Sequence, residues 1–87
     1  MKKTEGYRIR KLEDEYVVLP FGKRAEEVNE VISLSETAGF MYRHAEEADS
    51  AEELAELVSK AYEVEKSVVY EDVVSVVRTL REKGLLL

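Results

Sequence analysis

Few residues of this sequence have both the type and the spacing that catalysis or metal binding requires. The chain has no cysteine and one histidine, His44, which excludes disulfides, thiolate zinc sites, iron–sulfur clusters and histidine pairs. Glu46, Glu47 and Asp49 could hold a cation only loosely, because acidic residues are so frequent here that clusters arise by chance. No serine has a recognisable histidine and aspartate partner, and the glycines are isolated, unlike those of a phosphate-binding loop. We therefore expect no enzyme, no catalytic residue, no metal and no cofactor.

Length and charge narrow the remaining classes of protein. With 87 residues and a mass of 10.0 kDa, the chain is expected to form a single domain over residues 1–87. The formal net charge of −6 argues against binding to nucleic acid or to an anionic membrane. No apolar run approaches the roughly 20 residues of a membrane span, and no apolar segment follows the basic N-terminus as in a secretory signal. We expect a cytoplasmic protein that binds no nucleic acid and no membrane.

The charge is divided unevenly along the chain. Residues 1–24 carry seven basic and four acidic side chains, a net charge of +3, whereas residues 25–87 carry six basic and fifteen acidic ones, a net charge of −9. The boundary falls near Pro20 and Gly22. Such a division is typical of solvated faces on two kinds of secondary structure.

Three strands are expected in the first part of the chain. Residues 7–12 and 16–19 are separated by the polar pair Glu13-Asp14 and predict a hairpin, which Pro20 ends. Residues 23–27 read as a charged connection. The stretch 28–34 predicts a third short strand, with Ile32 and Leu34 pointing to one side.

Three helices are expected after residue 35, where the apolar period changes to 3.6. Ser35 is a suitable N-cap for the first helix, and Ser50 forms a capping box with Glu53 at the start of the second. Ser67 is expected to cap the third, and Gly84 to end it. Strands followed by helices indicate an α+β domain: a three-stranded antiparallel sheet and then three helices, resembling a winged helix-turn-helix.

Two features suggest a binding surface. An edge strand normally carries lysine, arginine or proline that prevents further pairing, and residues 28–34 contain none of them. This absence fits either a covered strand or an edge that accepts an added strand. The third helix has a buried stripe of valine and leucine at 69, 73, 76, 77 and 80 and continues as an apolar shoulder over Tyr70, Val74, Val77 and Arg81. That shoulder fits either burial between two neighbouring helices or one wall of an exposed groove.

Several segments, taken in order, resemble the PqqD-like family. They read YVVLPFG (16–22), NEVISLSETAGFMY (29–42), AEEL (51–54), AYEV (61–64), YEDV (70–73) and LREKGLL (80–86). The resemblance extends from about Tyr7 to Leu86. The chain departs from the family at two points. Where the family often has Leu-Asn-x-x-Gly, Ser35 follows Leu34 in place of asparagine, and the glycine, Gly39, comes one place later than in that motif. Tyr42 stands where tryptophan is frequent.

The resemblance implies a recognition element for ribosomally synthesised and modified peptides. Such a domain binds the leader of a precursor peptide and delivers it to a modifying enzyme, often a radical S-adenosylmethionine (SAM) maturase. The leader pairs with the third strand beside a groove on the third helix. Carried onto this chain, the expected peptide-binding residues are Asn29, Glu30, Val31, Ile32, Ser33 and Leu34 of the strand, and Val69, Tyr70, Val73, Val74, Val77, Arg78 and Arg81 of the helix. Arg78 and Arg81 are expected to pair with acidic leader residues.

Two other functions stay open at this stage. A winged-helix adaptor could use the same groove on a different peptide. A DNA-binding winged helix is the other alternative, although a recognition helix needs basic residues and this third helix has them only near its end.

Overall fold

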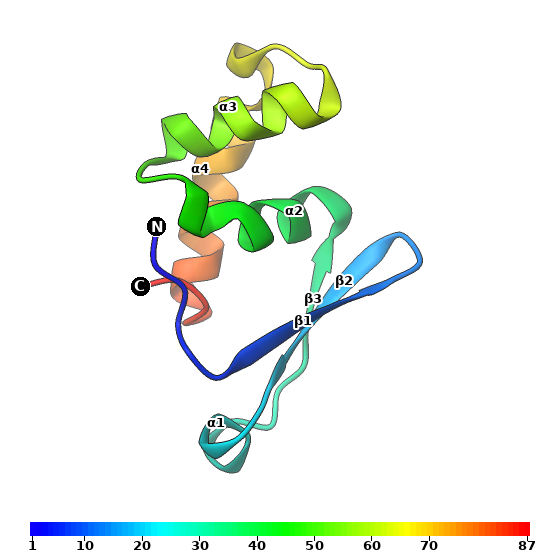
Figure 1. The fold of residues 1–87 in the computed structure, drawn as a ribbon, viewed down its shortest axis with the longest axis vertical. Coiled ribbons are helices and arrows are strands. Elements are labelled where there is room, and N and C mark those ends of the chain that lie inside the picture. The colour runs from blue at the N-terminus through cyan, green and yellow to red at the C-terminus, as the bar shows by residue number, and fades with distance from the viewer.

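The computed structural model describes the whole chain, Met1 to Leu87. It contains three strands, four α-helices and one 3₁₀ turn (Figure 1). In chain order these are β1 (Tyr7–Leu12), β2 (Glu15–Pro20), α1 (Lys23–Glu27), β3 (Ile32–Ser35), α2 (Glu36–His44), η1 (Ala45–Glu47), α3 (Ala51–Tyr62) and α4 (Lys66–Glu82). The strands form one antiparallel sheet in the order β1-β2-β3. The predicted α+β class, with a three-stranded sheet followed by three helices, is confirmed.

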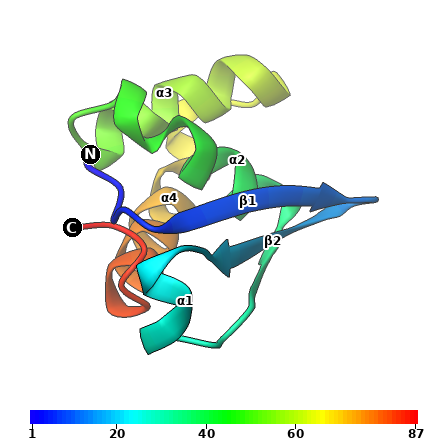
Figure 2. The ribbon, with the colours of Figure 1, turned by 60° about the horizontal axis from the view of Figure 1, so that its bottom comes forward.

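The sheet buries one of its two faces. Figure 2 shows α2 and α3 above the β1–β2 hairpin, with α1 on the other side. Tyr16 and Val18 of β2 pair with Leu34 and Ile32 of β3, and these four side chains are buried. Because side chains alternate along a strand, the intervening residues, such as Ser33, point to the uncovered face.

The close approach of α2 to the sheet depends on Gly39. A Cβ atom at this position would lie 2.1 Å from Cδ2 of the Tyr16 ring, so any side chain would force the helix away from β2. The helices and the sheet share one core of 17 buried apolar residues, in which Leu54, Leu80 and Val73 are almost fully enclosed. Gly39 therefore fixes the position of α2, and with it the position of the residues that follow β3.

Two of the three predicted helix caps are confirmed. The Ser35 hydroxyl accepts a hydrogen bond from the Ala38 N–H at 3.2 Å, and the Ser50 hydroxyl accepts one from the Glu53 N–H at 3.1 Å. The Glu53 carboxylate accepts a bond from the Asp49 N–H at 2.9 Å, one residue earlier than in a standard capping box. These bonds satisfy backbone donors at the first turns of α2 and α3.

The prediction that Ser67 caps the last helix is wrong. The helix α4 begins one residue earlier, at Lys66, and its N-cap Glu65 makes no side-chain cap bond. Ser67 already lies inside the first turn, where its hydroxyl is not placed to cap the free N–H groups. The start of α4 is held instead by Lys66, whose Nζ lies 2.9 Å from Glu52 and 3.1 Å from Glu56 of α3. Those hydrogen bonds raise the pKa of Lys66.

The end of α4 follows the prediction. Gly84 adopts a positive φ of 79°, and its N–H donates to the Arg81 carbonyl at 3.0 Å. The Leu85 N–H donates to the Leu80 carbonyl at 2.8 Å, and both leucine side chains are buried. This pair of bonds with its apolar contact is the Schellman arrangement, in which glycine is favoured because it tolerates the left-handed conformation.

Residues 23–27, predicted as a connection, instead form the short helix α1. Lysine, arginine, alanine and glutamate all favour helix, and the Val28 N–H closes the turn on the Arg24 carbonyl at 2.8 Å. None of its residues is buried, so the helix lacks the apolar stripe by which the sequence could have predicted it.

The two ends of the chain pair with each other, which the sequence pattern did not predict. Lys3 and Leu86 form an antiparallel bridge, the Thr4 N–H donates to Leu85 and the Leu87 N–H donates to Lys2, both at 3.0 Å. The residues after Gly84 therefore lie beside the residues that lead into β1 (Figures 1 and 2).

Candidate functional site

The outer edge of β3 has no partner strand. Only β2 pairs with it, because the sheet order is β1-β2-β3. The direction of its backbone groups follows from the alternation of bonded and non-bonded pairs along an antiparallel ladder. Just after β2, the Phe21 N–H donates to the Gly6 carbonyl at 2.9 Å. Counting back from Phe21 to Glu15, every second residue therefore bonds to β1 through its backbone. The remaining ones, Tyr16 and Val18, therefore face β3.

This alternation continues into β3. Tyr16 pairs with Leu34 and Val18 pairs with Ile32, so Leu34 and Ile32 direct their backbone N–H and C=O groups to β2. Ser33 directs both groups to the free edge, whereas Ser35 offers only its N–H there, because its carbonyl, as the N-cap of α2, accepts the first hydrogen bond of that helix. Ser33 is also exposed, so its backbone donor and acceptor are available to another chain.

The strand is shorter than the predicted 28–34. It covers Ile32–Ser35, and Asn29, Glu30 and Val31 lie in the irregular segment before it. Pairing stops there because Pro20, the last residue of β2, has no N–H to donate. The backbone groups of residues 29–31 make no hydrogen bond to other backbone groups, and the Val31 side chain is 55% exposed. The unpaired backbone therefore extends beyond β3 to include this segment.

A groove lies on α4 near the end of β3. Its volume is about 150 Å³, and it combines residues from three helices: Thr37 and Met41 of α2, Val58 of α3, and Val69, Asp72, Ser75 and Val76 of α4. Thr37 comes two residues after Ser35, the last residue of β3. The groove consequently opens where β3 passes into α2.

The predicted peptide-binding residues of α4 do not all face this groove. Val69 lines it, and Val73 is buried in the core. Val74, Val77, Arg78 and Arg81 line a different pocket of about 360 Å³, together with Ala51 and Glu82. Tyr70 lies in a third pocket, with Glu52, Lys66, Ser67 and Glu71.

The two pockets on α4 share no residue. Ala51 begins α3, beyond the C-terminal end of α2, whereas β3 joins α2 at its N-terminal end. With nine residues, α2 is about 14 Å long. Arg81 also donates from Nε to the Leu87 carbonyl at 3.1 Å. Arg78 and Arg81 line the pocket that Ala51 shares, not the groove near β3. Their role in peptide binding stays a prediction.

Sequence reasoning missed six of the seven groove residues: Thr37, Met41, Val58, Asp72, Ser75 and Val76. A signal was present in α4, because Val69, Asp72 and Val76 are spaced by three and four residues and share a face. The same spacing holds for Tyr70, Val74 and Val77, so the pattern could not tell which shoulder faces β3.

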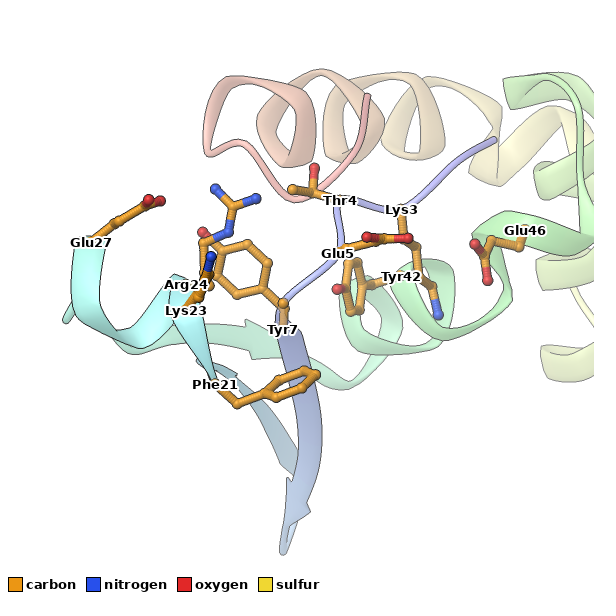
Figure 3. Close-up of a pocket in the computed structure, with 11 residues that line it drawn as sticks. Lys3, Thr4, Glu5, Tyr7, Phe21, Lys23, Arg24, Glu27, Tyr42 and Glu46 are labelled. Carbon is orange, nitrogen blue, oxygen red and sulfur yellow. The ribbon is translucent and has the colours of Figure 1, made fainter.

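A larger pocket, of about 660 Å³, lies at the start of β1 (Figure 3). Figure 3 shows Tyr7, Lys23 and Arg24 on one side of it, and Lys3 and Tyr42 on the other. Two of its three cations lie over aromatic rings: Arg24 over Tyr7 at 5.6 Å and Lys3 over Tyr42 at 4.8 Å. Three acidic residues balance the three basic ones, so the pocket has no net charge to attract an ionic ligand.

Burial shifts the proton affinity of two groups in this pocket. It lowers the pKa of Lys3, an effect that Arg43 reinforces and that Glu46 and Glu47 oppose. It raises the pKa of Tyr42, with smaller contributions from Tyr7 and Glu46. Both shifts favour the neutral form, as expected for groups withdrawn from water.

Neither a metal cluster nor a membrane span is present. No three histidine, cysteine, aspartate or glutamate side chains lie close enough together to hold a metal ion. His44 lies at the end of α2, with Nδ1 2.5 Å from Glu47 Oε2 and its ring 4.3 Å from that of Phe40. No helix has both the length and the apolar content needed to cross a bilayer.

Comparison with solved structures finds similar folds in two leader-peptide complexes. One is TbiB1 in complex with the TbiA(beta) leader peptide, with a TM-score of 0.72, 23% identity and coverage of 99% of this chain and 94% of that one. The other is lasso peptide synthetase B1 complexed with the leader peptide, with a TM-score of 0.70, 21% identity and coverage of 99% of this chain and 95% of that one. At these identities the likeness establishes the fold.

A family model gives the assignment. No protein with a curated description matches the chain. The model described as coenzyme PQQ synthesis protein D (PqqD) matches residues 15–86, which include β2, β3 and all four helices. The chain belongs to the PqqD family.

Proposed function

We propose that this chain is a non-catalytic peptide-recognition domain that binds the leader segment of a ribosomally synthesised precursor peptide. The leader adds as a strand to the outer edge of β3 and presents side chains to the groove on α4. The observation that carries the proposal is the unpaired edge of β3, together with a groove whose residue Thr37 follows two positions after the strand ends. In this proposal residues 1–87 act as one domain.

Strand addition suits the geometry of this edge. Ser33 directs a backbone donor and acceptor outward and can exchange two hydrogen bonds with an antiparallel strand, and Ser35 adds one outward N–H. Val31 falls at the next position of the same alternation, so the irregular segment 29–31 can lengthen the strand when a partner pairs with it. Backbone bonds supply affinity regardless of leader sequence, and the groove then supplies selectivity.

The comparisons support the same function. The family is that of a coenzyme synthesis protein, and both structural neighbours were solved with leader peptides bound. A domain that holds a leader needs a partner that modifies the rest of the precursor. We propose a modifying enzyme, a radical SAM maturase, as that partner.

The alternatives from the sequence are less well supported. An enzyme would need a cluster of catalytic groups, and the groove contains one ionisable side chain, Asp72. A DNA-binding winged helix would need a basic recognition helix, whereas the groove side of α4 carries Asp72 and no cation. A winged-helix adaptor for another peptide would use the same edge and is distinguished by which peptide binds.

A titration followed by NMR tests the proposal. The ¹⁵N-labelled chain is titrated with a synthetic leader peptide from the precursor gene nearest to its own gene. The amides of Val31, Ser33 and Ser35 should shift and become protected from exchange, because their N–H groups become hydrogen-bonded. An unrelated peptide of equal length and charge serves as the control.

The same spectra show where the proposal would fail. If the leader bound but shifted only residues around Ala51, Arg78 and Arg81, the peptide site would lie on the other side of α4. If the leader and the unrelated peptide produced the same shifts, selective leader recognition would be contradicted.

A further inference from the structure

The groove beside β3 is apolar at its base and polar at its rim. Met41 and Val58 form the base and are each 2% exposed, while Val69 and Val76 form half-buried walls. Asp72, Thr37 and Ser75 are exposed and carry the polar atoms of the rim. A volume of about 150 Å³ accommodates one side chain of moderate size.

The rim carries a single charge, and that charge is free. Asp72 is the one ionisable residue among those lining the groove. It makes no ion pair and no side-chain hydrogen bond, unlike Glu36 of α2, which lies 4.0 Å from Lys11, and Glu52 of α3, which binds Lys66. An exposed carboxylate beside two hydroxyls attracts a cation or a hydrogen-bond donor and repels an anion.

We infer that the groove selects a leader residue with an apolar stem and a cationic end, lysine or arginine, at the position next to the Ser35 end of β3. The methylene stem packs against Met41, Val69 and Val76, and the charged end reaches the Asp72 carboxylate at the rim. An acidic leader residue at this position is rejected, because it would bring two carboxylates together. This inference rests on the proposed function and specifies the chemistry of its ligand.

The size of the preference follows from the exposure of Asp72. A solvent-exposed ion pair changes an affinity by roughly 1.5- to 5-fold, because water and salt screen it. The apolar stem contributes separately and does not require the charge. Lysine and norleucine, which share a stem of similar length and differ in charge, therefore separate the two contributions.

Selection from a random 12-residue peptide display library provides the test. The full chain is immobilised in three forms: the parent, Asp72→Lys and Ser33→Pro. We expect the parent to enrich lysine or arginine at one fixed position of the selected peptides, and Asp72→Lys to enrich aspartate or glutamate there. A selected peptide is then synthesised with lysine or norleucine at that position, and its affinity is measured for the parent and for Asp72→Asn.

Lysine should exceed norleucine by about 1.5- to 5-fold on the parent. The two peptides should bind Asp72→Asn equally, and added salt should reduce the difference on the parent. Equal binding of both peptides to the parent would overturn the inference, as would identical residue preferences in the parent and Asp72→Lys pools.

The Ser33→Pro pool separates this inference from the proposed function. If Ser33→Pro selects the same peptides as the parent, strand addition at β3 is contradicted while a dependence on Asp72 still supports the groove. If Ser33→Pro loses them and the dependence on Asp72 is absent, strand addition stands and the inference fails. If no pool is enriched, both are wrong.

Discussion

Replacing Ser33 with proline removes a backbone donor from the free edge of β3 and leaves the pairing with β2 in place. The Ser33 N–H points away from β2, because the bonded pairs of that ladder are Tyr16–Leu34 and Val18–Ile32. Proline is tolerated on an edge strand where its missing N–H faces solvent. The variant should therefore fold and still lose affinity for the leader.

The expected loss follows from one missing hydrogen bond. A leader carbonyl that faces Ser33 would be left buried without a donor, which costs about 1–3 kcal/mol. Since 1.4 kcal/mol corresponds to a tenfold change, the dissociation constant should rise roughly 5- to 150-fold. Val31→Pro removes a donor just before the strand and should weaken binding in the same direction, and it leaves β3 itself unchanged.

Fluorescence anisotropy with a labelled leader peptide measures these affinities. Lys11→Pro is the matched control, because the Lys11 N–H points to the free edge of β1 on the opposite side of the sheet. Its affinity should equal that of the parent, and circular dichroism should show that all three variants remain folded. Unchanged leader affinity in folded Ser33→Pro and Val31→Pro would refute strand addition at β3.

Three further predictions concern the fold that holds this edge in place. Gly39→Ala should lower the free energy of unfolding in urea by about 1–3 kcal/mol, because its Cβ would lie 2.1 Å from the Tyr16 ring; parental stability would contradict this packing. Ser50→Ala should cost about 1 kcal/mol in the same assay, since it removes the cap of α3, whereas Ser67→Ala should cost nothing measurable. Burial raises the pKa of Tyr42, so unfolding releases its proton more readily and stability should fall as the pH rises above the usual tyrosine value of about 10. Between about pH 9 and pH 11, the free energy of unfolding of Tyr42→Phe in urea should fall less steeply with pH than that of the parent. Parallel curves for the two proteins would argue against this assignment.

Local signals in the sequence determined most of the secondary structure. The hydroxyls of Ser35 and Ser50 and the glycine at 84 act within a few residues, so they mark the ends of helices without knowledge of the rest of the fold. The apolar spacing determined that Val73, Val77 and Leu80 are buried, because they share one stripe of α4. The absence of lysine, arginine and proline from residues 28–34 left open whether this strand is covered or free, and the sheet order shows that its outer edge is free.

Which side of α4 lies toward that edge depends on how the helices pack. Two shoulders flank its buried stripe, and both contain valines at helical spacing, so periodicity alone does not distinguish them. The rotation of α4 is set by its packing on α2 and α3, through contacts between residues distant in sequence such as Met41, Val58 and Val76. The pairing of Lys3 with Leu86 likewise joins the two ends of the chain. Such contacts form only when the whole core packs, and they place Asp72 near β3 and Arg81 on the opposite side of the helix.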